Sequence, residues 1–196
     1  MKTGLFFGSF NPIHIGHLAI ANYMVEYSDM EQVWFVVSPH NPLKKKESLL
    51  SDIHRLTMVR IAIEYDRRFK ASNIEFDLPQ PSYTIDTLVY LKEQHPDREF
   101  VIIMGADQIS AFTKWKNYEE LIKSTKRYVY PRPGNTIDIN DPLMQNAQLI
   151  DAPQMDISSS FIRSAIAQGK DIRHFLHQKV WEFIDEMNFY KKTYKL

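Results

Sequence analysis

Runs of apolar residues alternate along this chain with longer stretches in which apolar side chains recur at helical spacing. The clearest runs are β-branched or aromatic and uninterrupted, which is typical of strands buried on both faces. They predict strands at residues 5–7, 33–37, 69–76, 100–104, 127–130 and 147–150, of which 69–76 alternates only weakly. The stretches between and after them predict helices at 14–27, from 51 onward with an inward stripe of Leu56, Val59 and Ile63, and at 82–94, 159–168 and 178–187.

Strands that alternate with helices indicate βαβ units and an α/β protein. We therefore expect a Rossmann-like, mostly parallel, doubly wound sheet, followed by a C-terminal helical segment from about residue 158. The chain of 196 residues fits one compact domain, because no Gly/Ser-rich linker or shift in composition divides it. In such folds ligands bind outside the carboxyl ends of the strands, so residues that follow strand ends are candidates for the site.

Composition narrows the classes of function. The 24 basic and 24 acidic residues balance, whereas a general nucleic-acid binder carries a basic excess, so we expect no nucleic-acid partner. Cysteine is absent, which excludes a disulfide framework and fits a reducing compartment. The apolar stretch at the N-terminus is too short for a signal peptide, and no run approaches a membrane span. We expect a soluble cytoplasmic protein without a membrane partner.

Distinctive residues follow the first predicted strand. Gly8 permits a tight turn and a close approach of a ligand to the backbone. His14 and His17 would share one face of the first helical turn, where free N–H groups and the helix dipole favour an anion, and Gly16 keeps this surface open. Two imidazoles there can donate hydrogen bonds to phosphate. The pair also fits a metal site or two surface histidines, but a strand, a glycine turn and a helix start in one segment favour phosphate.

A second candidate lies near residues 157–163, which read Ile-Ser-Ser-Ser-Phe-Ile-Arg. Serines at a helix start can cap the helix and leave N–H groups for an anion. Arg163 lies three residues beyond Ser160, on the same face, and could hold a phosphate through two hydrogen bonds. Taken alone, the segment favours a capped helix with a surface arginine.

These two segments resemble the signature of the nucleotidyltransferases. Residues 8–17 match the run Gly-x-Phe-x-Pro-x-His-x-Gly-His that binds ATP phosphates, and residues 157–163 match an Ile-Ser-Ser-Thr-x-Ile-Arg element, with Ser160 in place of Thr. The His-Ile-Gly-His tetrad also occurs in class I aminoacyl-tRNA synthetases, but those are much longer and carry a Lys-Met-Ser-Lys-Ser-like stretch that is missing here. The resemblance implies ATP binding by Gly8, Ser9, Phe10, His14, Gly16, His17, Ile157, Ser158, Ser160 and Arg163.

Two central motifs are similar to those of bacterial nicotinate mononucleotide adenylyltransferases. The run from Ser82 to Leu88 resembles the element that opens a helix over the acceptor, and Gly105-Ala106-Asp107 with Trp115 resembles the Gly-Ala-Asp…Trp pairing. The resemblance implies that Asp107 binds ribose hydroxyls and that Trp115 stacks on the pyridine ring. The plain alternatives are a helix N-cap for Asp107 and a half-buried aromatic for Trp115. The implied acceptor-binding set is Ser82, Tyr83, Thr84, Gly105, Asp107 and Trp115, with Thr84 and nearby N–H groups at the nicotinate carboxylate.

Basic residues elsewhere are harder to assign. The loop after the second predicted strand holds Lys44 and Lys45 where the family often has Pro-Pro-His-Lys, so either lysine is a candidate for phosphate, and Lys46 is read as a solvated bystander. Arg55 occupies a family-like position, although its plain interpretation is a salt bridge on a helix surface. Arg132 also matches a family pattern, without a clear role.

The resemblance implies adenylyl transfer from ATP to nicotinate mononucleotide, which gives nicotinate adenine dinucleotide and pyrophosphate in NAD biosynthesis. The implied catalytic groups are His14, His17, Lys44 (or Lys45) and Arg163. A Mg²⁺ ion would bridge the phosphates, and the sequence offers no dedicated protein cage for a metal. Phosphopantetheine or nicotinamide mononucleotide as the acceptor, a non-catalytic nucleotide-sensing module and an RNA-binding role are the rivals. The sequence leaves a homo-oligomer open.

Overall fold

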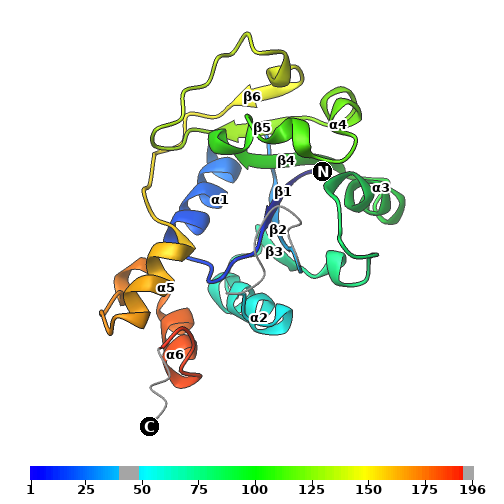
Figure 1. Cartoon of the computed structure of the whole chain (residues 1–196). Helices are drawn as coiled ribbons and strands as arrows, with labels where there is room; N and C mark the ends of the chain where they lie inside the picture. Colours follow the sequence, from blue (N-terminus) through cyan, green and yellow to red (C-terminus); the bar gives the residue numbers. More distant parts are fainter. Residues whose placement is uncertain (40–48, 192–196) are drawn as a thin grey trace.

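A computed structural model describes residues 1–39 and 49–191 of the chain and contains one six-stranded sheet (Figure 1). The strand order is β3-β2-β1-β4-β5-β6, and all five pairings are parallel. The expected Rossmann-like sheet is confirmed, and it is wholly parallel. The strands are β1 (Lys2–Gly8), β2 (Gln32–Val37), β3 (Phe69–Ser72), β4 (Glu99–Gly105), β5 (Arg127–Tyr130) and β6 (Ala147–Leu149).

The strand order reverses at β1, which lies between β2 and β4. The chain adds β2 and β3 on one side of β1 and then returns to place β4, β5 and β6 on the other. A crevice forms at the carboxyl end of such a switch point, because the loops on its two sides diverge. The loops after Gly8 and Gly105 border this crevice, and both carry residues of the predicted site.

Helices cover both faces of the sheet, so the doubly wound arrangement is confirmed (Figure 1). Alternate side chains of each strand enter opposite cores; Phe35 enters the first core, and its neighbours Trp34 and Val36 enter the second. The first core is closed by α1 (Ile15–Tyr27), α2 (Asp52–Ile63), α5 (Ser159–Ala167) and α6 (Gln178–Glu186). The second is closed by α3 (Thr84–Gln94) and α4 (Tyr118–Ser124).

The C-terminal helical segment packs against the same core as the first helices. Ile162 of α5 and Val180 and Ile184 of α6 are fully buried or nearly so within the first core. At roughly 25 cal/mol per Å² of apolar surface, each such side chain contributes about 2 kcal/mol to this attachment. None of the helices in the described part of the chain is long and apolar enough to cross a membrane.

Two sequence-based boundaries were wrong, and one helix was missed. The predicted strand 69–76 ends at Ser72, because the chain then turns into a 3₁₀ helix, Ile74–Phe76, that carries the Glu75 side chain into the protein. The helix predicted from residue 82 begins at Thr84. Helix α4 has only seven residues, too few for a clear hydrophobic period.

Candidate active site

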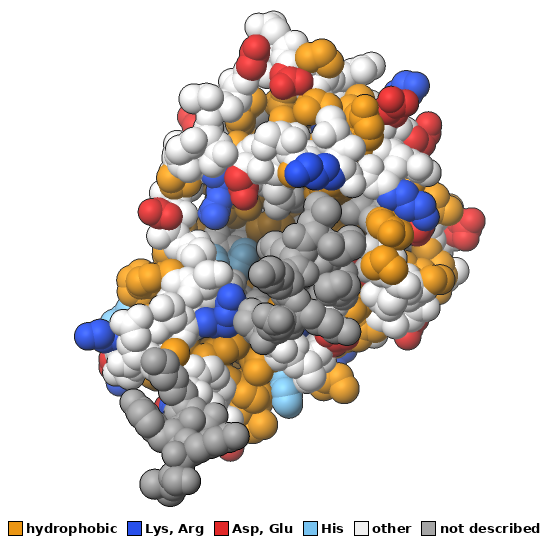
Figure 2. Space-filling model, in the orientation of Figure 1, with side chains coloured by type: hydrophobic (Ala, Val, Ile, Leu, Met, Phe, Trp, Pro, Cys, Tyr) orange, Lys and Arg blue, Asp and Glu red, His pale blue; other side chains and the backbone are white. Residues whose placement is uncertain are grey.

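The two predicted phosphate motifs meet at the carboxyl edge of the sheet, although they lie far apart in the sequence. Arg163 of α5 donates from Nη1 to the carbonyl oxygen of Asn11 at 2.8 Å. The Ser159 hydroxyl donates to the carbonyl oxygen of Pro12 at 2.9 Å. The start of α5 therefore docks directly on the loop that leads into α1. Figure 2 shows pale-blue histidine atoms inside a hollow on this side of the molecule, with basic side chains at its border.

The His14 and His17 rings stack on each other at the start of α1. Their centroids are 3.7 Å apart, and the planes are inclined by 29°. His17 Nδ1 accepts a hydrogen bond from the His14 backbone N–H at 3.2 Å, in the manner of a capping box. Because Nδ1 of His17 is an acceptor, a neutral His17 carries its proton on Nε2, where it can be donated. The shared face that the spacing predicted is confirmed.

His14 is held as a neutral imidazole. Its side chain is 4% exposed, and Nδ1 is buried without a hydrogen-bond partner among the described residues. Burial, assisted by the positive charge of Arg132, lowers the pKa of His14 to about 4. At neutral pH the ring therefore offers one N–H donor and carries no charge.

Gly16 makes room for the His14 ring. A Cβ atom at residue 16 would lie 3.0 Å from His14 Nδ1 and 3.1 Å from Cε1, closer than ordinary van der Waals contact. The open side of Gly16, which the sequence assigned to the ligand, thus faces the His14 ring.

The other predicted ATP-binding residues lie in the same loop or at the start of α5. The Phe10 side chain is 2% exposed and packs against Phe6, His17 and Phe35, so only its backbone is available to a ligand. Ser158 caps α5 by accepting from the Phe161 N–H at 3.1 Å. The Ser160 hydroxyl accepts from Arg163 Nη2 at 3.2 Å, which orients the guanidinium. Gly8 and Ser9 lead from β1 into the loop, and Ile157 packs beside the first core.

Asn11 joins this loop to the C-terminal segment. Its side-chain oxygen accepts from the Tyr190 hydroxyl at 2.7 Å and from the Leu50 N–H at 3.3 Å. Burial raises the pKa of the Tyr190 hydroxyl well above its usual value, so it stays a donor. Sequence reasoning missed Tyr190, because a single tyrosine beyond the last helix carries no pattern.

Arg55 corrects a sequence-based interpretation. The expected salt bridge is present, to Asp52, but the Arg55 side chain is fully buried at the start of α2 and does not lie on the helix surface. All five of its N–H donors are used, which is how a buried guanidinium avoids a large desolvation cost. The acceptors are the carbonyl oxygens of Ser9 (2.6 Å), Ser38 (2.9 Å), Leu50 (3.1 Å) and Pro39 (3.2 Å), and the Asp52 carboxylate (2.5 Å).

Asp107 lies beside Arg132 after β4. Asp107 belongs to a short 3₁₀ turn, Ala106–Gln108, with Gly105 at its cap, so the N-cap alternative for Asp107 was wrong. Asp107 Oδ1 is 3.8 Å from Arg132 Nε. A Cβ on Gly105 would lie 2.4 Å from that carboxylate oxygen and 3.1 Å from Arg132 Cγ, so a side chain here would displace the Asp107 carboxylate from this position. Arg132, whose role the sequence left open, therefore contributes its charge to both Asp107 and His14.

The acceptor motifs also come together. Trp115 is half-buried against Phe112, with ring centroids 4.9 Å apart. The neighbouring Lys116 places Nζ 4.8 Å from the centre of the Tyr83 ring and pairs with Asp86 at 2.9 Å. Thr84 begins α3, with Tyr83 at its N-cap. The segment over the predicted acceptor thus lies next to the predicted stacking aromatic.

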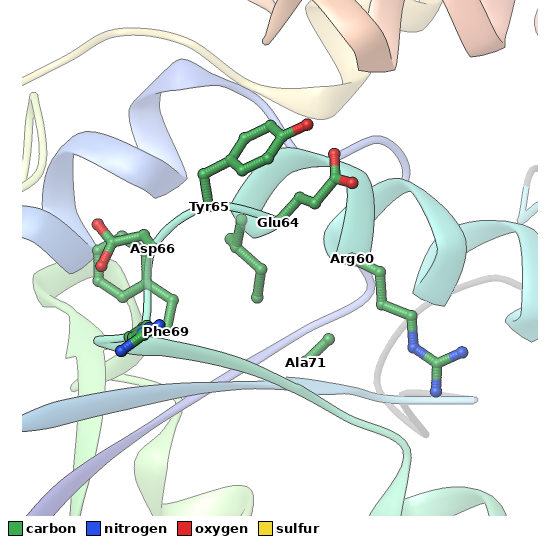
Figure 3. A pocket seen from close by; sticks show the side chains of 8 residues that line it. Arg60, Glu64, Tyr65, Asp66, Phe69 and Ala71 are labelled. Carbon is green, nitrogen blue, oxygen red and sulfur yellow. The ribbon is translucent and has the colours of Figure 1, made fainter.

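The lysine candidates and the question of a metal site remain to be placed. Lys44 and Lys45, with Lys46, fall within residues 40–48 and lie outside the described residues. In the described ranges there is no group of three His, Asp or Glu side chains that could hold a metal ion. An open groove of about 570 Å³ lies elsewhere, beside edge strand β3, where Arg60, Glu64, Tyr65 and Phe69 line it together with other residues from the end of α2 onward (Figure 3). None of the predicted site residues lines that groove.

A family model described as cytidylyltransferase-like matches residues 5–165. This span contains all the motifs described above and covers most of the chain, and the chain belongs to this family of nucleotidyltransferases.

Curated relatives narrow the class. Proteins from Flavobacterium johnsoniae (53% identical; 98% of this chain and 100% of that protein) and Christiangramia forsetii (54%; 97% and 98%) are each named "probable nicotinate-nucleotide adenylyltransferase". Within the family, the chain belongs with the nicotinate-nucleotide adenylyltransferases. The fold also matches the Plasmodium falciparum nicotinic acid mononucleotide adenylyltransferase complexed with NaAD, with a TM-score of 0.80 at 22% identity over 96% of this chain and 97% of that one.

The Arg55 contacts predict a large loss of stability on a conservative change. Lysine has three donors, so Arg55→Lys leaves at least two buried acceptors without a partner, at about 1–3 kcal/mol each. We expect the free energy of unfolding in urea to fall by about 2–4 kcal/mol. Arg60→Lys, on the exposed side of α2, is the matched control and should change it by less than about 0.5 kcal/mol. Equal effects of the two changes would contradict the assigned role.

The pKa of His14 predicts a pH dependence of stability. The pKa of His14 is about 4 in the folded protein, below its ordinary value of 6.5. The contribution of neutral His14 to the free energy of unfolding is therefore complete above pH 6.5 and is lost as the pH falls towards 4. The full effect is about 3 kcal/mol. The free energy of unfolding of His14→Gln should therefore depend less steeply on pH over this range, because about one proton fewer is taken up on unfolding. His174→Gln, which removes an exposed imidazole, is the matched control. Identical slopes of the free energy of unfolding against pH for His14→Gln and wild type would contradict the prediction.

Proposed function

We propose that this site joins nicotinate mononucleotide to the AMP part of ATP, releasing pyrophosphate and forming nicotinate adenine dinucleotide. The observation that carries the proposal is the docking of the α5 start on the Gly8–His17 loop, where Arg163 bonds to Asn11 and Ser159 to Pro12. Two anion-binding helix starts and two histidines then face one crevice, beside the acceptor motifs. Relatives at about 50% identity over the full length support the same reaction.

The chemistry needs positioning more than proton transfer. The acceptor phosphate is already an anion near neutral pH, so it can attack the α-phosphorus of ATP in line without a general base. The main task is to neutralise charge that develops on the transferring group and on the departing pyrophosphate. No covalent intermediate is required.

We assign this task to donors on both motifs. His17 donates from Nε2 to phosphate, and the neutral His14 donates through its one N–H, both at the positive end of the α1 dipole. Arg163 contributes a fixed positive charge on the α5 side. Lys44 or Lys45 supplies a further charge from the loop after β2. A Mg²⁺ ion bound together with ATP would be held mainly by phosphate and water oxygens and would supply further positive charge to the phosphates.

The acceptor occupies the other half of the crevice. Asp107 accepts hydrogen bonds from its ribose hydroxyls, and Trp115 stacks on the pyridine ring. The N–H groups of Tyr83 and Thr84 at the start of α3, with the Thr84 hydroxyl, bind the nicotinate carboxylate. We place the reaction in the cytoplasm, because the chain lacks cysteine, and we assign no nucleic-acid partner, because its charges balance.

The test of the reaction is pyrophosphate release from ATP and Mg²⁺ with three acceptors in parallel. We expect strong preference for nicotinate mononucleotide over nicotinamide mononucleotide and phosphopantetheine, because the N–H groups at the start of α3 favour an anion. Preference for another acceptor would keep adenylyl transfer and overturn the substrate. No release with any of them would instead support a nucleotide-sensing module.

The two halves of the crevice should respond differently to mutation. His17→Ala removes a donor to the transferring phosphate and should lower kcat about 10²-fold, which corresponds to about 2.7 kcal/mol of transition-state stabilisation. Trp115→Ala should raise KM for nicotinate mononucleotide and leave KM for ATP nearly unchanged. Unchanged turnover in the first variant would remove His17 from the mechanism. An equal rise in the KM values for both substrates in the second variant would indicate misfolding instead of a lost stacking contact.

A further inference from the structure

Glu75 carries a carboxyl group that is buried inside the protein, where loss of hydration disfavours a charged carboxylate. It lies in the 3₁₀ helix after β3, and its residue is 3% exposed. Burial raises its pKa above the usual value. No Lys or Arg of the described residues forms an ion pair with it. Because an unpaired buried carboxylate contributes little to stability, its presence at this point calls for another explanation.

Three hydroxyl groups converge on this carboxylate. The Thr87 hydroxyl donates to Oε1 at 2.9 Å, and the Ser82 hydroxyl donates to Oε2 at 3.1 Å. The Ser38 hydroxyl is the third donor. Both oxygens are therefore occupied, and all three donors come from segments that border the crevice.

Two of the three donors enclose the predicted acceptor segment. Ser82 precedes Tyr83 and Thr84, and Thr87 follows them on the first turn of α3. The Thr87 hydroxyl also lies within hydrogen-bond distance of the Tyr83 carbonyl oxygen, at 3.2 Å. The bonds to Glu75 thus hold the start of α3 from both sides. The Ser82 side chain is turned inward to Glu75, so the acceptor can meet this residue mainly through its backbone.

The third donor connects the same carboxylate to the phosphate half of the site. Ser38 follows β2, and its backbone N–H donates to the Gly8 carbonyl oxygen at 2.9 Å. Its own carbonyl oxygen accepts from the buried Arg55 at 2.9 Å. Glu75 therefore lies between the loop that begins the ATP motif and the segment that begins α3.

We infer that Glu75 is a positioning residue that sets the acceptor-binding segment at Ser82–Thr84 relative to the phosphate site. This inference rests on the proposed function. Binding of nicotinate to backbone N–H groups requires that these already point at the carboxylate, because a segment ordered only on binding loses affinity. A merely structural carboxylate would instead affect folding stability and leave the relative affinities of the two substrates unchanged.

The decisive comparison uses two buried threonines. Thr87→Val removes one donor to Glu75 while keeping the shape of the side chain. Thr3→Val makes the same chemical change near the amino end of β1, where the fully buried Thr3 hydroxyl accepts from Arg98 at 3.1 Å. We expect Thr87→Val, and likewise Ser82→Ala, to raise KM for nicotinate mononucleotide about tenfold with KM for ATP unchanged. Thr3→Val should alter neither KM, although both valine variants lower the melting temperature.

Changes at Glu75 itself provide the second arm. Glutamine can accept from one hydroxyl and donate to another, so Glu75→Gln should retain a KM for nicotinate mononucleotide near that of wild type. Glu75→Leu leaves the three hydroxyls without this partner and should raise that KM at least as much as Thr87→Val. If the leucine variant does not fold, the single-hydroxyl variants decide the question.

The outcomes separate the two levels of inference. Similar changes in both KM values, or the same behaviour of Thr87→Val and Thr3→Val, would overturn the positioning role while the proposed reaction stands. Wild-type protein that releases no pyrophosphate with nicotinate mononucleotide would overturn the proposed function, and this inference with it.

Discussion

The buried guanidinium of Arg55 is the interaction on which the arrangement of the site depends. It lies under the loops that leave β1 and β2, and its five donors are all satisfied by them and by the start of α2. Loops at strand ends have backbone carbonyl groups that lack the hydrogen-bond partners a helix or sheet would provide. A single planar group with five fixed donors holds several of these carbonyls at once. The start of the phosphate motif is thus held in a fixed position, and catalysis by positioning of the reactants requires this.

Other buried polar groups extend this base in two directions. Asn11 links the phosphate loop to α5 through Arg163 and to the C-terminal segment through Tyr190. Glu75 links the end of β2 to the start of α3 through hydroxyl groups. These contacts are made by polar atoms inside the protein, where an unmade hydrogen bond is expensive. The crevice is therefore bordered by segments whose relative positions are strongly constrained before a substrate arrives.

The histidine pair shows how this constraint affects chemistry. Burial and the positive charge of Arg132 keep His14 neutral, and the capping bond to His17 Nδ1 assigns the proton of a neutral His17 to Nε2. Both rings thereby become oriented donors. A surface pair with the same spacing would be free to rotate and to titrate near neutral pH. The environment, more than the residue type, determines what these two side chains can do.

The sequence by itself determined the layered α/β fold, the order of the motifs and their location after strand ends, because strand and helix periods and glycine turns are local properties of the chain. It also predicted that His14 and His17 share a face, since three residues make about one helical turn. Only the tertiary structure decided that Arg55 is buried, that Glu75 leaves the predicted strand to hold Ser82 and Thr87, and that Asn11 and Tyr190 meet. These contacts join segments that are distant in sequence, or they bury polar side chains that the local hydrophobic pattern would place at the surface. Which polar side chain becomes buried depends on the hydrogen-bond partners that the whole fold brings to it, and no local period records those partners.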